Sequence, residues 1–562
     1  MNRLFPKFLI FFSLVIPAYG QNNNMAIITV RDTVYHTIGP QFYGIQYHGH
    51  TFSDQTALDL LNHLNLKIVR VWAEIQDFHP RPGVWHWKEL DQKIAEIIAA
   101  GYEAVPCLWG EKWFVGSADT AWWNYDAALA EWDSAAYRLA DRYKNTVRKI
   151  IVFDELNMLH PEQDYYISFK DAARLFLRAA KSIKSVNPNI RCGGPSSFGG
   201  WENGQWANYV LNEPNGSDYL DFISSNTFLS WNPSDSDQEI LARTIWYEEV
   251  PLKIKEMLND KLHPELMLDA YNLSALWTWN GELWTDPRNT NSIGGIYQVA
   301  ALLHGAKGGF DITIHWEILG GFGIFNWYPQ FNEMAPYYSW KLLVEIAGLT
   351  NDSQIIGCTT TEVPKSDVQH HGGMNVDLYD VQPFAIRRVD GGISVVLINK
   401  NPSDTLTRVI HVPPEMKSYE LYRYDDSRMQ DSSLPLEQKN TEPVLEINCP
   451  PYSVTVIKFG FNEQTRILDN SASLPKTNRL YQNYPNPFNA QTTIVFDLLA
   501  ASHVSINILN ILGENVKSLV NDYMSAGRHS IVFDASSLSS GIYYYQMKTD
   551  NYNDVKQFIL SK

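Results

Sequence analysis

Between residues 40 and 347, short apolar segments alternate eight times with amphipathic ones, and this repeat limits the folds open to the chain. The short segments read as strands buried on both faces of a parallel sheet. The segments between them place apolar residues at helical spacing. Eight strands with intervening helices predict a closed (β/α)8 TIM barrel. The predicted strands are residues 42–48, 66–72, 102–109, 149–157, 190–195, 220–226, 265–270 and 310–317.

An open, doubly wound α/β sheet is the main alternative, but no glycine-rich phosphate loop follows the first strand. We therefore assign residues 21–350 to the barrel. After residue 350 the pattern changes to short strands separated by Gly, Pro, Asn and Asp, which predicts an antiparallel β-sandwich over residues 351–460. Residues 26–36 are a candidate additional strand of that sandwich. Residues 461–479 are polar and patternless, as in a linker, and residues 480–562 predict a small Ig-like β-sandwich.

The first twenty residues have the pattern of a secretory signal peptide. Arg3 and Lys7 precede an apolar centre at residues 8–16, and small residues near position 20 suit cleavage. A membrane anchor is the alternative, but this apolar run is too short to span a bilayer. We expect an exported protein with no membrane-spanning segment.

The bulk composition excludes some functions. A formal net charge of −17 argues against nucleic acid as a partner, because the chain could not neutralise a phosphate backbone. The four cysteines are too few and too scattered for a disulfide framework or a zinc site. Cys107 and Cys192 lie in apolar runs, where buried thiols are expected. We expect neither a metal nor a cofactor.

Tryptophan is confined to one part of the chain. All 18 tryptophans lie between Trp72 and Trp340. A core needs large residues but not this one type, so the bias favours a surface that stacks on sugar rings. Trp109 and Trp316 follow predicted strand ends, where a cleft would lie, although packing explains either one equally well by itself.

Acidic residues lie at the ends of three predicted barrel strands, namely Glu155, Asp269 and Glu317. The carboxyl ends of barrel strands are where catalytic groups are placed. Cleavage of a glycosidic bond needs one carboxylic acid to protonate the leaving oxygen and a second carboxylate as nucleophile or base. Arg70 lies inside an apolar strand, where a lone charge is costly, so we expect it to be the ion partner of one of these carboxylates.

The chain resembles clan A glycoside hydrolases over about residues 40–460, with a layout closest to family 39, which includes β-xylosidases and α-L-iduronidases. The resemblance rests on residues 83–91, the strand that carries Glu155, residues 220–226 and residues 451–455. It implies that Glu155 is the general acid/base. Asp154 stands where the clan has an asparagine that bonds the sugar 2-hydroxyl.

The resemblance also implies a nucleophilic glutamate at the end of the seventh strand, but this chain has Ala270 there. Asp269 is one residue away, and a one-residue offset in a strand turns a side chain to the opposite face. Three hypotheses follow: a bulge brings Asp269 into place, Glu317 takes the role, or the second carboxylate has been lost. Carboxyls roughly 6.5–9.5 Å apart would favour inversion, and about 5–5.5 Å would favour retention.

Further candidate substrate contacts lie at the strand ends. Together with the residues above, the predicted substrate-binding set is Arg70, Trp109, Asp154, Asn157, Asn226, Tyr271, Trp316 and His48. Each of the added residues (Asn157, Asn226, Tyr271 and His48) is equally well explained as a core or rim group.

The last eighty or so residues resemble the type IX secretion sorting domain. The matching segments are residues 484–489, 508–513 and 539–545. The resemblance implies export by the type IX machinery, followed by tail removal or attachment to the cell surface.

These features predict a secreted or surface-attached glycosidase that acts on a polysaccharide or oligosaccharide. The alternative is a non-catalytic carbohydrate-binding protein that kept the barrel and lost its nucleophile at Ala270. A weaker third hypothesis is an adhesin in which the barrel is only a scaffold.

Overall fold

The chain divides into two compact units in a computed structural model, the first ending at Gly460 and the second beginning at Phe461. The structure describes residues 25–49, 51–110, 126–154, 167–199, 203–230, 232–259, 262–276, 278–279, 282–283, 285–327, 331–369, 375–461 and 478–561, apart from 482, 484, 485, 487, 525 and 550. The predicted signal peptide lies outside these residues, as does most of the predicted linker.

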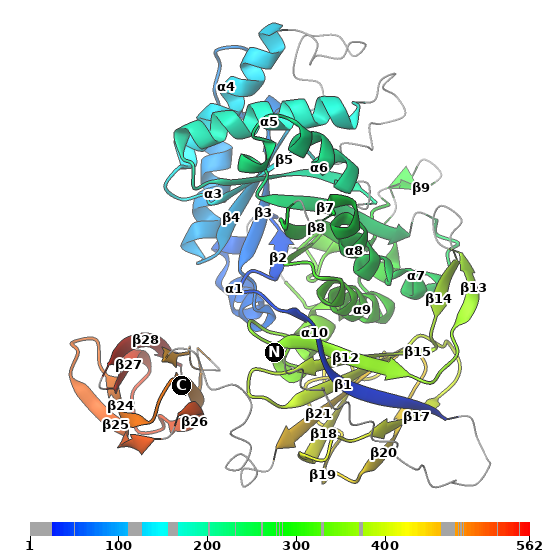
Figure 1. Cartoon of the computed structure of the whole chain (residues 1–562), viewed down its shortest axis with the longest axis vertical. Helices are drawn as coiled ribbons and strands as arrows, with labels where there is room; N and C mark the ends of the chain where they lie inside the picture. The colour runs from blue at the N-terminus through cyan, green and yellow to red at the C-terminus, as the bar shows by residue number, and fades with distance from the viewer. Residues whose placement is uncertain are drawn as a thin grey trace, which may run out of the picture. The chain divides into compact units, whose positions relative to one another are not determined.

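Eight parallel strands of the first unit close into a barrel in the order β11-β2-β3-β4-β5-β6-β7-β8 (Figure 1). They are β2 Tyr43–Gln46, β3 Ile68–Glu74, β4 Glu103–Trp109, β5 Lys149–Val152, β6 Arg191–Phe198, β7 Phe222–Ser230, β8 Glu265–Ser274 and β11 Ile312–His315. Each overlaps one predicted strand, so the predicted barrel is confirmed. One compact apolar cluster takes residues from β3, β4, β5, β7, β8 and β11, among them Ile68, Val105, Ile151 and Ile314.

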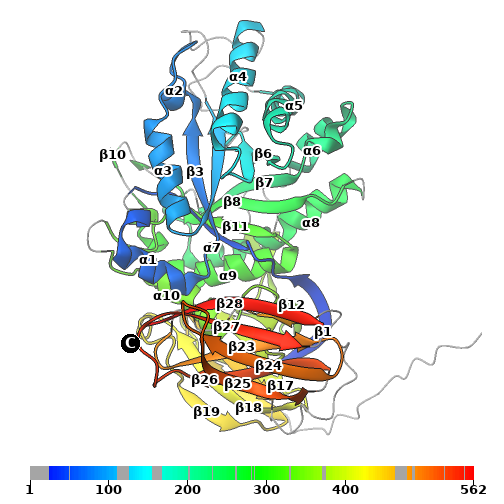
Figure 2. The same cartoon turned by 90° about the vertical axis from the view of Figure 1, so that its left-hand side faces the viewer.

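Helices cover the outside of the barrel (Figures 1 and 2). They are α1 Gln55–Leu61, α2 Ile75–Phe78, α3 Lys88–Ala99, α4 Asp126–Tyr143, α5 Phe169–Val186, α6 Asn203–Asn212, α7 Asp237–Arg243, α8 Trp246–Leu258, α9 Ser292–Gly308 and α10 Ala335–Lys341. In α5, Ser168 caps the first turn by accepting from the Asp171 amide, and Ala172, Phe176 and Ile183 are buried along one stripe. This helical spacing of apolar residues is what seats the helix on the barrel.

A nine-stranded sheet packs against the barrel within the same unit, in the order β19-β18-β21-β16-β15-β12-β1-β17-β20. Its strands are β1 Ala26–Thr37, β12 Gln354–Thr360, β15 Val381–Arg387, β16 Ile393–Asn399, β17 Leu406–His411, β18 Met416–Tyr424, β19 Glu437–Asn440, β20 Val444–Cys449 and β21 Ser453–Phe461; two short hairpins are β9 Thr278–Trp279 with β10 Glu282–Leu283 and β13 Lys365–Gln369 with β14 Asn375–Leu378. Strand β1 pairs with β12 and β17, so the segment before the barrel does join this sheet. The Tyr424 hydroxyl donates to the Ala335 carbonyl (3.2 Å), which ties the sheet to α10.

The second unit is a small β-sandwich, as predicted. One sheet has the order β22-β23-β26 and the other β25-β24-β27-β28. The strands are β22 Arg479–Leu480, β23 Gln491–Leu498, β24 Ser502–Leu509, β25 Asn515–Met524, β26 Gly527–Asp534, β27 Gly541–Thr549 and β28 Tyr552–Leu560. Phe496, Ile506, Tyr545 and Phe558 fill the core between the sheets.

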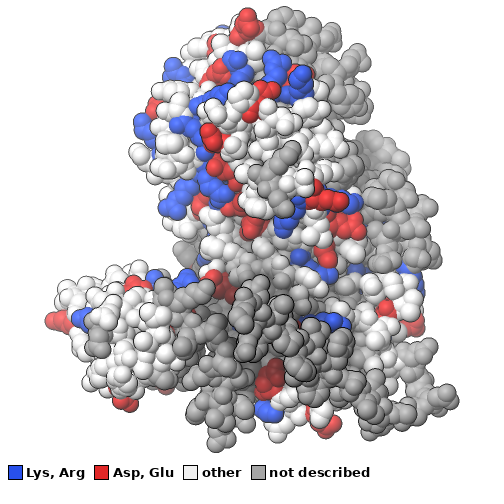
Figure 3. Space-filling view, in the orientation of Figure 1, with Lys and Arg blue, Asp and Glu red and all other residues white. Residues whose placement is uncertain are grey.

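The surface carries charges of both signs. On the face in Figure 3, acidic and basic side chains of the described residues are interspersed. Among the described helices, none combines the length and the apolar character needed to cross a bilayer. All four cysteines are unpaired, and Cys107 and Cys192 are buried as predicted.

Candidate active site

Arg70 is the centre of a buried polar cluster inside the barrel. Its side chain points inward from β3 and is 1% exposed. The guanidinium hydrogen-bonds Asp154 through Nη2 and Gln46 Oε1 through Nη1 (2.9 Å), and its Nε lies 3.7 Å from Asp269 Oδ2. One of the predicted carboxylates, Asp269, is therefore an ion partner of Arg70, as expected. One positive charge faces two carboxyl groups, and none of the three side chains is more than 6% exposed.

Ser196 joins the two carboxyl groups. Its hydroxyl lies within hydrogen-bond distance of both Asp269 Oδ2 and Asp154 Oδ1, and the second distance is 3.2 Å. The register of β6 against β7 shifts between Pro195 and Ser197, and Ser196 has a φ of +55°. This irregularity turns the hydroxyl toward the cluster. Ser196 was not among the predicted site residues, although the Gly-Gly-Pro segment before it indicates an interrupted strand.

The cluster is electrically balanced when one carboxyl group is protonated. Burial raises the pKa of Asp269 to about 7, helped by the negative charge of Asp154 and opposed by Arg70 and the Ser196 hydroxyl. Burial also raises the pKa of the Cys107 thiol well above its ordinary value, so this neighbour of Arg70 is neutral. At neutral pH, Asp269 is therefore poised between its neutral and ionised forms.

Strand β8 contains the bulge that one of our hypotheses required. Ser225 pairs with Leu268 but the next residue, Asn226, pairs with Ala270, so β8 has an extra residue at Asp269. Asp269 can thus face the barrel interior, where it is fully buried. Ala270 contributes instead to an apolar cluster with Phe228, Trp316 and Phe322. The predicted nucleophile position holds a methyl group in apolar surroundings.

The same bulge removes Tyr271 from the predicted substrate contacts. Tyr271 is 1% exposed; its hydroxyl accepts from Gln298 Nε2 (2.8 Å), and its ring packs against Tyr247 and His315. It lies between the barrel wall and the helices, where a sugar has no access, and this corrects the expectation. Asn226 is 3% exposed at the level of Ala270.

Glu317 lies at the carboxyl end of β11 and is more accessible than Asp269. Its Oε2 is 3.1 Å from His48 Nδ1, and the two side chains are 16% and 31% exposed, respectively. The Glu317 amide donates to Phe322 O (3.2 Å), and Asn272 Nδ2 donates to the carbonyls of Trp316 and Phe322. These bonds hold the segment after β11 in place, so the carboxylate is fixed beside His48.

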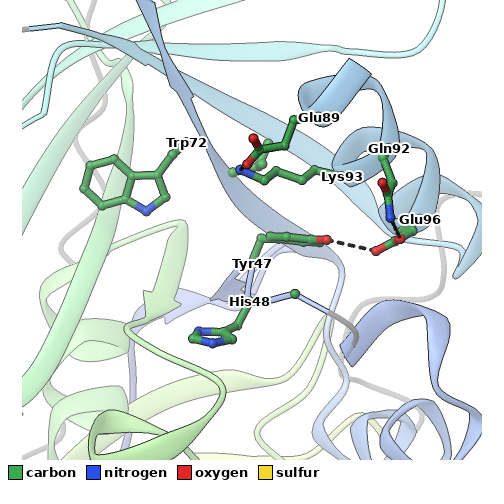
Figure 4. A pocket seen from close by; sticks show the side chains of 9 residues that line it. Tyr47, His48, Trp72, Glu89, Gln92, Lys93 and Glu96 are labelled. Carbon is green, nitrogen blue, oxygen red and sulfur yellow. Dashed lines mark hydrogen bonds and ion pairs between the residues drawn. The ribbon is translucent and has the colours of Figure 1, made fainter. Parts of the chain in front are cut away.

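The Trp72 ring lies over the Arg70 guanidinium, and the Trp109 ring lies next to Trp72. The guanidinium carbon is 4.9 Å from the Trp72 ring centroid, and the Trp72 and Trp109 rings are 5.3 Å apart. A hollow of about 310 Å³ begins at Trp72 and His48 and extends to Glu89 and Lys93 of α3 (Figure 4). Aromatic and polar side chains thus share the surface of this hollow.

Of the predicted site residues, the structure brings Arg70, Asp154 and Asp269 into one cluster and Glu317 and His48 into another. Glu155 and Asn157 lie outside the described residues. Asp154, which precedes Glu155 in the chain, is described and nearly buried against Arg70. No group of three or more His, Cys, Asp or Glu that could hold a metal ion occurs within the described ranges.

Comparison with known proteins identifies one part of the chain. Residues 482–561 match the secretion system C-terminal sorting domain. This domain marks the protein for export and for secretion or attachment to the cell surface. No curated protein matches the chain.

Solved structures share the barrel and the sheet packed on it. They include CelM2, a bifunctional glucanase-xylanase from a metagenome library (TM-score 0.55, 14% identity, 78% of this chain and 100% of that one). An α-L-arabinofuranosidase from Thermotoga maritima (0.56, 16%, 77% and 99%) and a monomeric β-xylosidase from Caulobacter crescentus CB15 (0.51, 16%, 77% and 99%) are also similar. At this identity the likeness shows the fold alone: a closed eight-stranded barrel with a β-sheet packed on it. Membership of clan A, and of family 39 within it, stays a prediction.

Proposed function

We propose that this protein is an exported glycoside hydrolase that cleaves glycosidic bonds in a polysaccharide or oligosaccharide. Glu155 is the general acid/base and Glu317 is the second catalytic carboxylate. The observation that carries the proposal is the Glu317–His48 pair: a partly exposed carboxylate, held by a histidine at the carboxyl end of a barrel strand and next to Trp316. The barrel shared with glucanase, xylanase, arabinofuranosidase and xylosidase structures supports the same reaction class.

Burial favours Glu317 over Asp269 as the second carboxylate. Asp269 is fully buried, and its Oδ2 atom is engaged by Ser196 and faces Arg70. A nucleophile or a base that activates water must reach the anomeric carbon, which a carboxylate beneath the surface cannot do. Asp269 and Arg70 instead fix Asp154, and through it the chain that leads into Glu155.

His48 holds the Glu317 carboxyl group in position, because its Nδ1 lies 3.1 Å from Glu317 Oε2. A fixed carboxyl group at a strand end is what either a nucleophile or a base requires. The separation of Glu155 from Glu317 decides between retention and inversion.

Two variants and two leaving groups test the assignment of roles. The substrates are aryl β-xylosides, aryl α-L-arabinofuranosides and aryl β-glucosides, each carrying either a dinitrophenyl or an unactivated phenyl group, and the polymers are xylan and β-glucan. Glu155→Gln should lower kcat/KM on phenyl glycosides roughly 100- to 10,000-fold, and much less on dinitrophenyl glycosides, whose leaving group needs no proton. Glu317→Gln should impair both classes, because it removes the second carboxylate. Equal effects of Glu155→Gln on both leaving groups would contradict its role as the acid.

A non-catalytic carbohydrate-binding protein is the second candidate, favoured by Ala270 and its apolar surroundings. In that case the wild-type chain would bind a polysaccharide without turnover, and Glu155→Gln would leave the binding unchanged. The same panel separates the two functions. We also propose that the sorting domain engages the type IX secretion machinery. Deletion of residues 480–562 tests this, and the shortened protein should remain inside the cell.

A further inference from the structure

Trp327, in the segment after β11, presents its ring on the surface. The side chain is 60% exposed, although a large aromatic group gains by burial. The ring is seated on Gly320: a Cβ added there would come within 2.4 Å of the indole, and Gly320 has a φ of +77°. Glycine therefore lets the backbone approach one side of the ring. The ring therefore rests on the backbone at Gly320 and stays largely exposed.

This ring adjoins the Glu317–His48 pair. The Trp327 and His48 rings contact edge to face, with centroids 5.8 Å apart, and His48 Nδ1 is 3.1 Å from Glu317. A sugar stacked on Trp327 would be close to the carboxylate to which we assign catalysis.

His48 also borders the hollow of about 310 Å³ in which Trp72 forms one wall (Figure 4). A second hollow of about 330 Å³ shares Trp72, Glu89 and Lys93 with the first. The two hollows and the Trp327 ring thus belong to one surface. His48 joins them and places Glu317 beside this surface. Among the described residues, this surface offers three contact regions, namely the Trp327 ring and the two hollows, which is more than an enzyme that removes single terminal sugars is expected to need.

The charges along the hollows indicate which sugars fit. The one lysine in the first hollow, Lys93, is paired with Glu89 (2.6 Å), and Glu96 accepts from the Tyr47 hydroxyl (2.8 Å). The second hollow adds Glu74 and Asp77 on the acidic side and Lys88 on the basic side. Negative charge is in excess over the described lining, so an anionic sugar would be repelled, whereas the hydroxyls of a neutral sugar can bond these carboxylates.

We propose that Trp327, His48 and the hollows beside Trp72 form an extended binding strip for a chain of neutral sugars, which the protein cleaves internally. This proposal rests on the glycosidase function proposed above. It goes further by naming an uncharged polysaccharide as substrate and endo action as the mode.

Chain-length dependence tests the strip. Neutral xylo- and gluco-oligosaccharides of two to six units are assayed with the full chain, with products sized over time. We expect kcat/KM to rise with length and internal products to appear first. Trp327→Ala should reduce kcat/KM on the hexamer roughly 10- to 100-fold and to a smaller degree on shorter chains. Trp327→Phe should recover part of the loss, and Tyr209→Ala, an exposed aromatic on α6, is the matched control without effect.

Charge is tested with polygalacturonate and its methyl ester, which differ in the carboxylate alone. We expect the ester to bind more tightly, with a difference that shrinks as salt is added. Tighter binding of the acid form would overturn the neutral-sugar assignment. Two results would overturn the proposed binding strip and leave the glycosidase function intact. One is the release of single sugar units before internal products, and the other is an equal effect of Trp327→Ala at every chain length. If no substrate is turned over but Trp327→Ala abolishes polysaccharide binding, the glycosidase function and internal cleavage are both overturned, and only the binding strip is supported.

Discussion

Asp269→Asn tests whether the buried cluster holds a proton. Arg70 faces Asp154 and Asp269, so the three groups are neutral together when one carboxyl group is protonated. Burial raises the pKa of Asp269 from an ordinary value of 3.8 to about 7. Asparagine has nearly the shape of the protonated acid and does not titrate. The variant should therefore fold as the wild type does at low pH and be more stable at high pH.

The direction in which stability changes with pH follows from proton binding to the folded and unfolded chains. Between about pH 4 and pH 7, the folded chain keeps the Asp269 proton while the unfolded chain has lost it, so wild-type stability falls as the pH rises through this window. The gap between a pKa of 3.8 and one of about 7 corresponds to about 4 kcal/mol in the free energy of unfolding. This is the gain expected for Asp269→Asn at pH 8. At pH 4, close to the ordinary pKa of 3.8, the two proteins should differ by less than about 1 kcal/mol.

Urea denaturation followed by tryptophan fluorescence is the assay. All 18 tryptophans lie between Trp72 and Trp340, so the signal reports the barrel and not the C-terminal unit. Asp133→Asn is the matched control, since Asp133 pairs with Arg178 at the surface and should show no comparable effect. If the stabilities of wild type and Asp269→Asn stay parallel from pH 4 to pH 8, or if the variant is the weaker at pH 8, Asp269 is ionised in the folded chain and this reasoning is wrong.

Three further substitutions probe buried polar groups with the same assay. Arg70→Met should lower the free energy of unfolding by about 3–5 kcal/mol, because it leaves two buried carboxyl groups without their cation. The control Arg178→Met, at a surface ion pair, should lower it by less than about 1 kcal/mol, and similar losses in both variants would contradict the prediction. Ser196→Ala should lower the free energy of unfolding by about 1–3 kcal/mol, because it removes the hydroxyl between Asp154 and Asp269. An unchanged stability would show that this hydroxyl does not stabilise the fold. Burial lowers the pKa of Lys400 to about 7, so charging of this lysine lowers the free energy of unfolding as the pH falls. Lys400→Met should therefore gain up to roughly 5 kcal/mol at pH 6 and less than about 1 kcal/mol at pH 10, and a gain independent of pH would contradict this.

The barrel could be predicted because its strands are buried on both faces and its helices on one. Such segments show uninterrupted apolar runs or a helical period, which a single sequence displays. In the C-terminal unit, β25 and β28 are hard to recognise as strands from the sequence. Most residues of β25 are exposed and it alternates weakly, and exposed polar residues such as Asn553 and Gln557 interrupt β28. Pairing with neighbouring strands, rather than their own composition, makes them strands.

The site was predictable where a residue's chemistry conflicts with its surroundings. Arg70 in an apolar strand required an ion partner, and the structure provides Asp154 and Asp269. Bulges are harder, because one extra residue reverses the orientation of everything after it without changing the local sequence pattern. The bulge in β8 turned Tyr271 outward, and the irregularity in β6 brought in Ser196, which no pattern had marked.

Ala270 separates the two proposed functions most sharply. It is buried with Phe228, Trp316 and Phe322, at the position where the resemblance to clan A implies a nucleophile. If Glu317 serves instead, a glutamate at 270 adds a like charge near it and crowds Trp316, so Ala270→Glu should lower turnover at least about 10-fold. Ala270→Gln has the same size without the charge and should impair turnover through crowding alone.

If the barrel is instead a binding protein that lost its nucleophile, these two variants diverge. Ala270→Glu would return a carboxylate to the required position and create hydrolysis of aryl glycosides that wild type lacks, whereas Ala270→Gln would not. The stereochemistry of the product adds a second readout, because a carboxylate close to the acid favours retention. A gain of turnover in Ala270→Glu and none in Ala270→Gln would therefore refute the role of Glu317. It would establish that the wild-type protein is inactive because it lacks a carboxylate at residue 270.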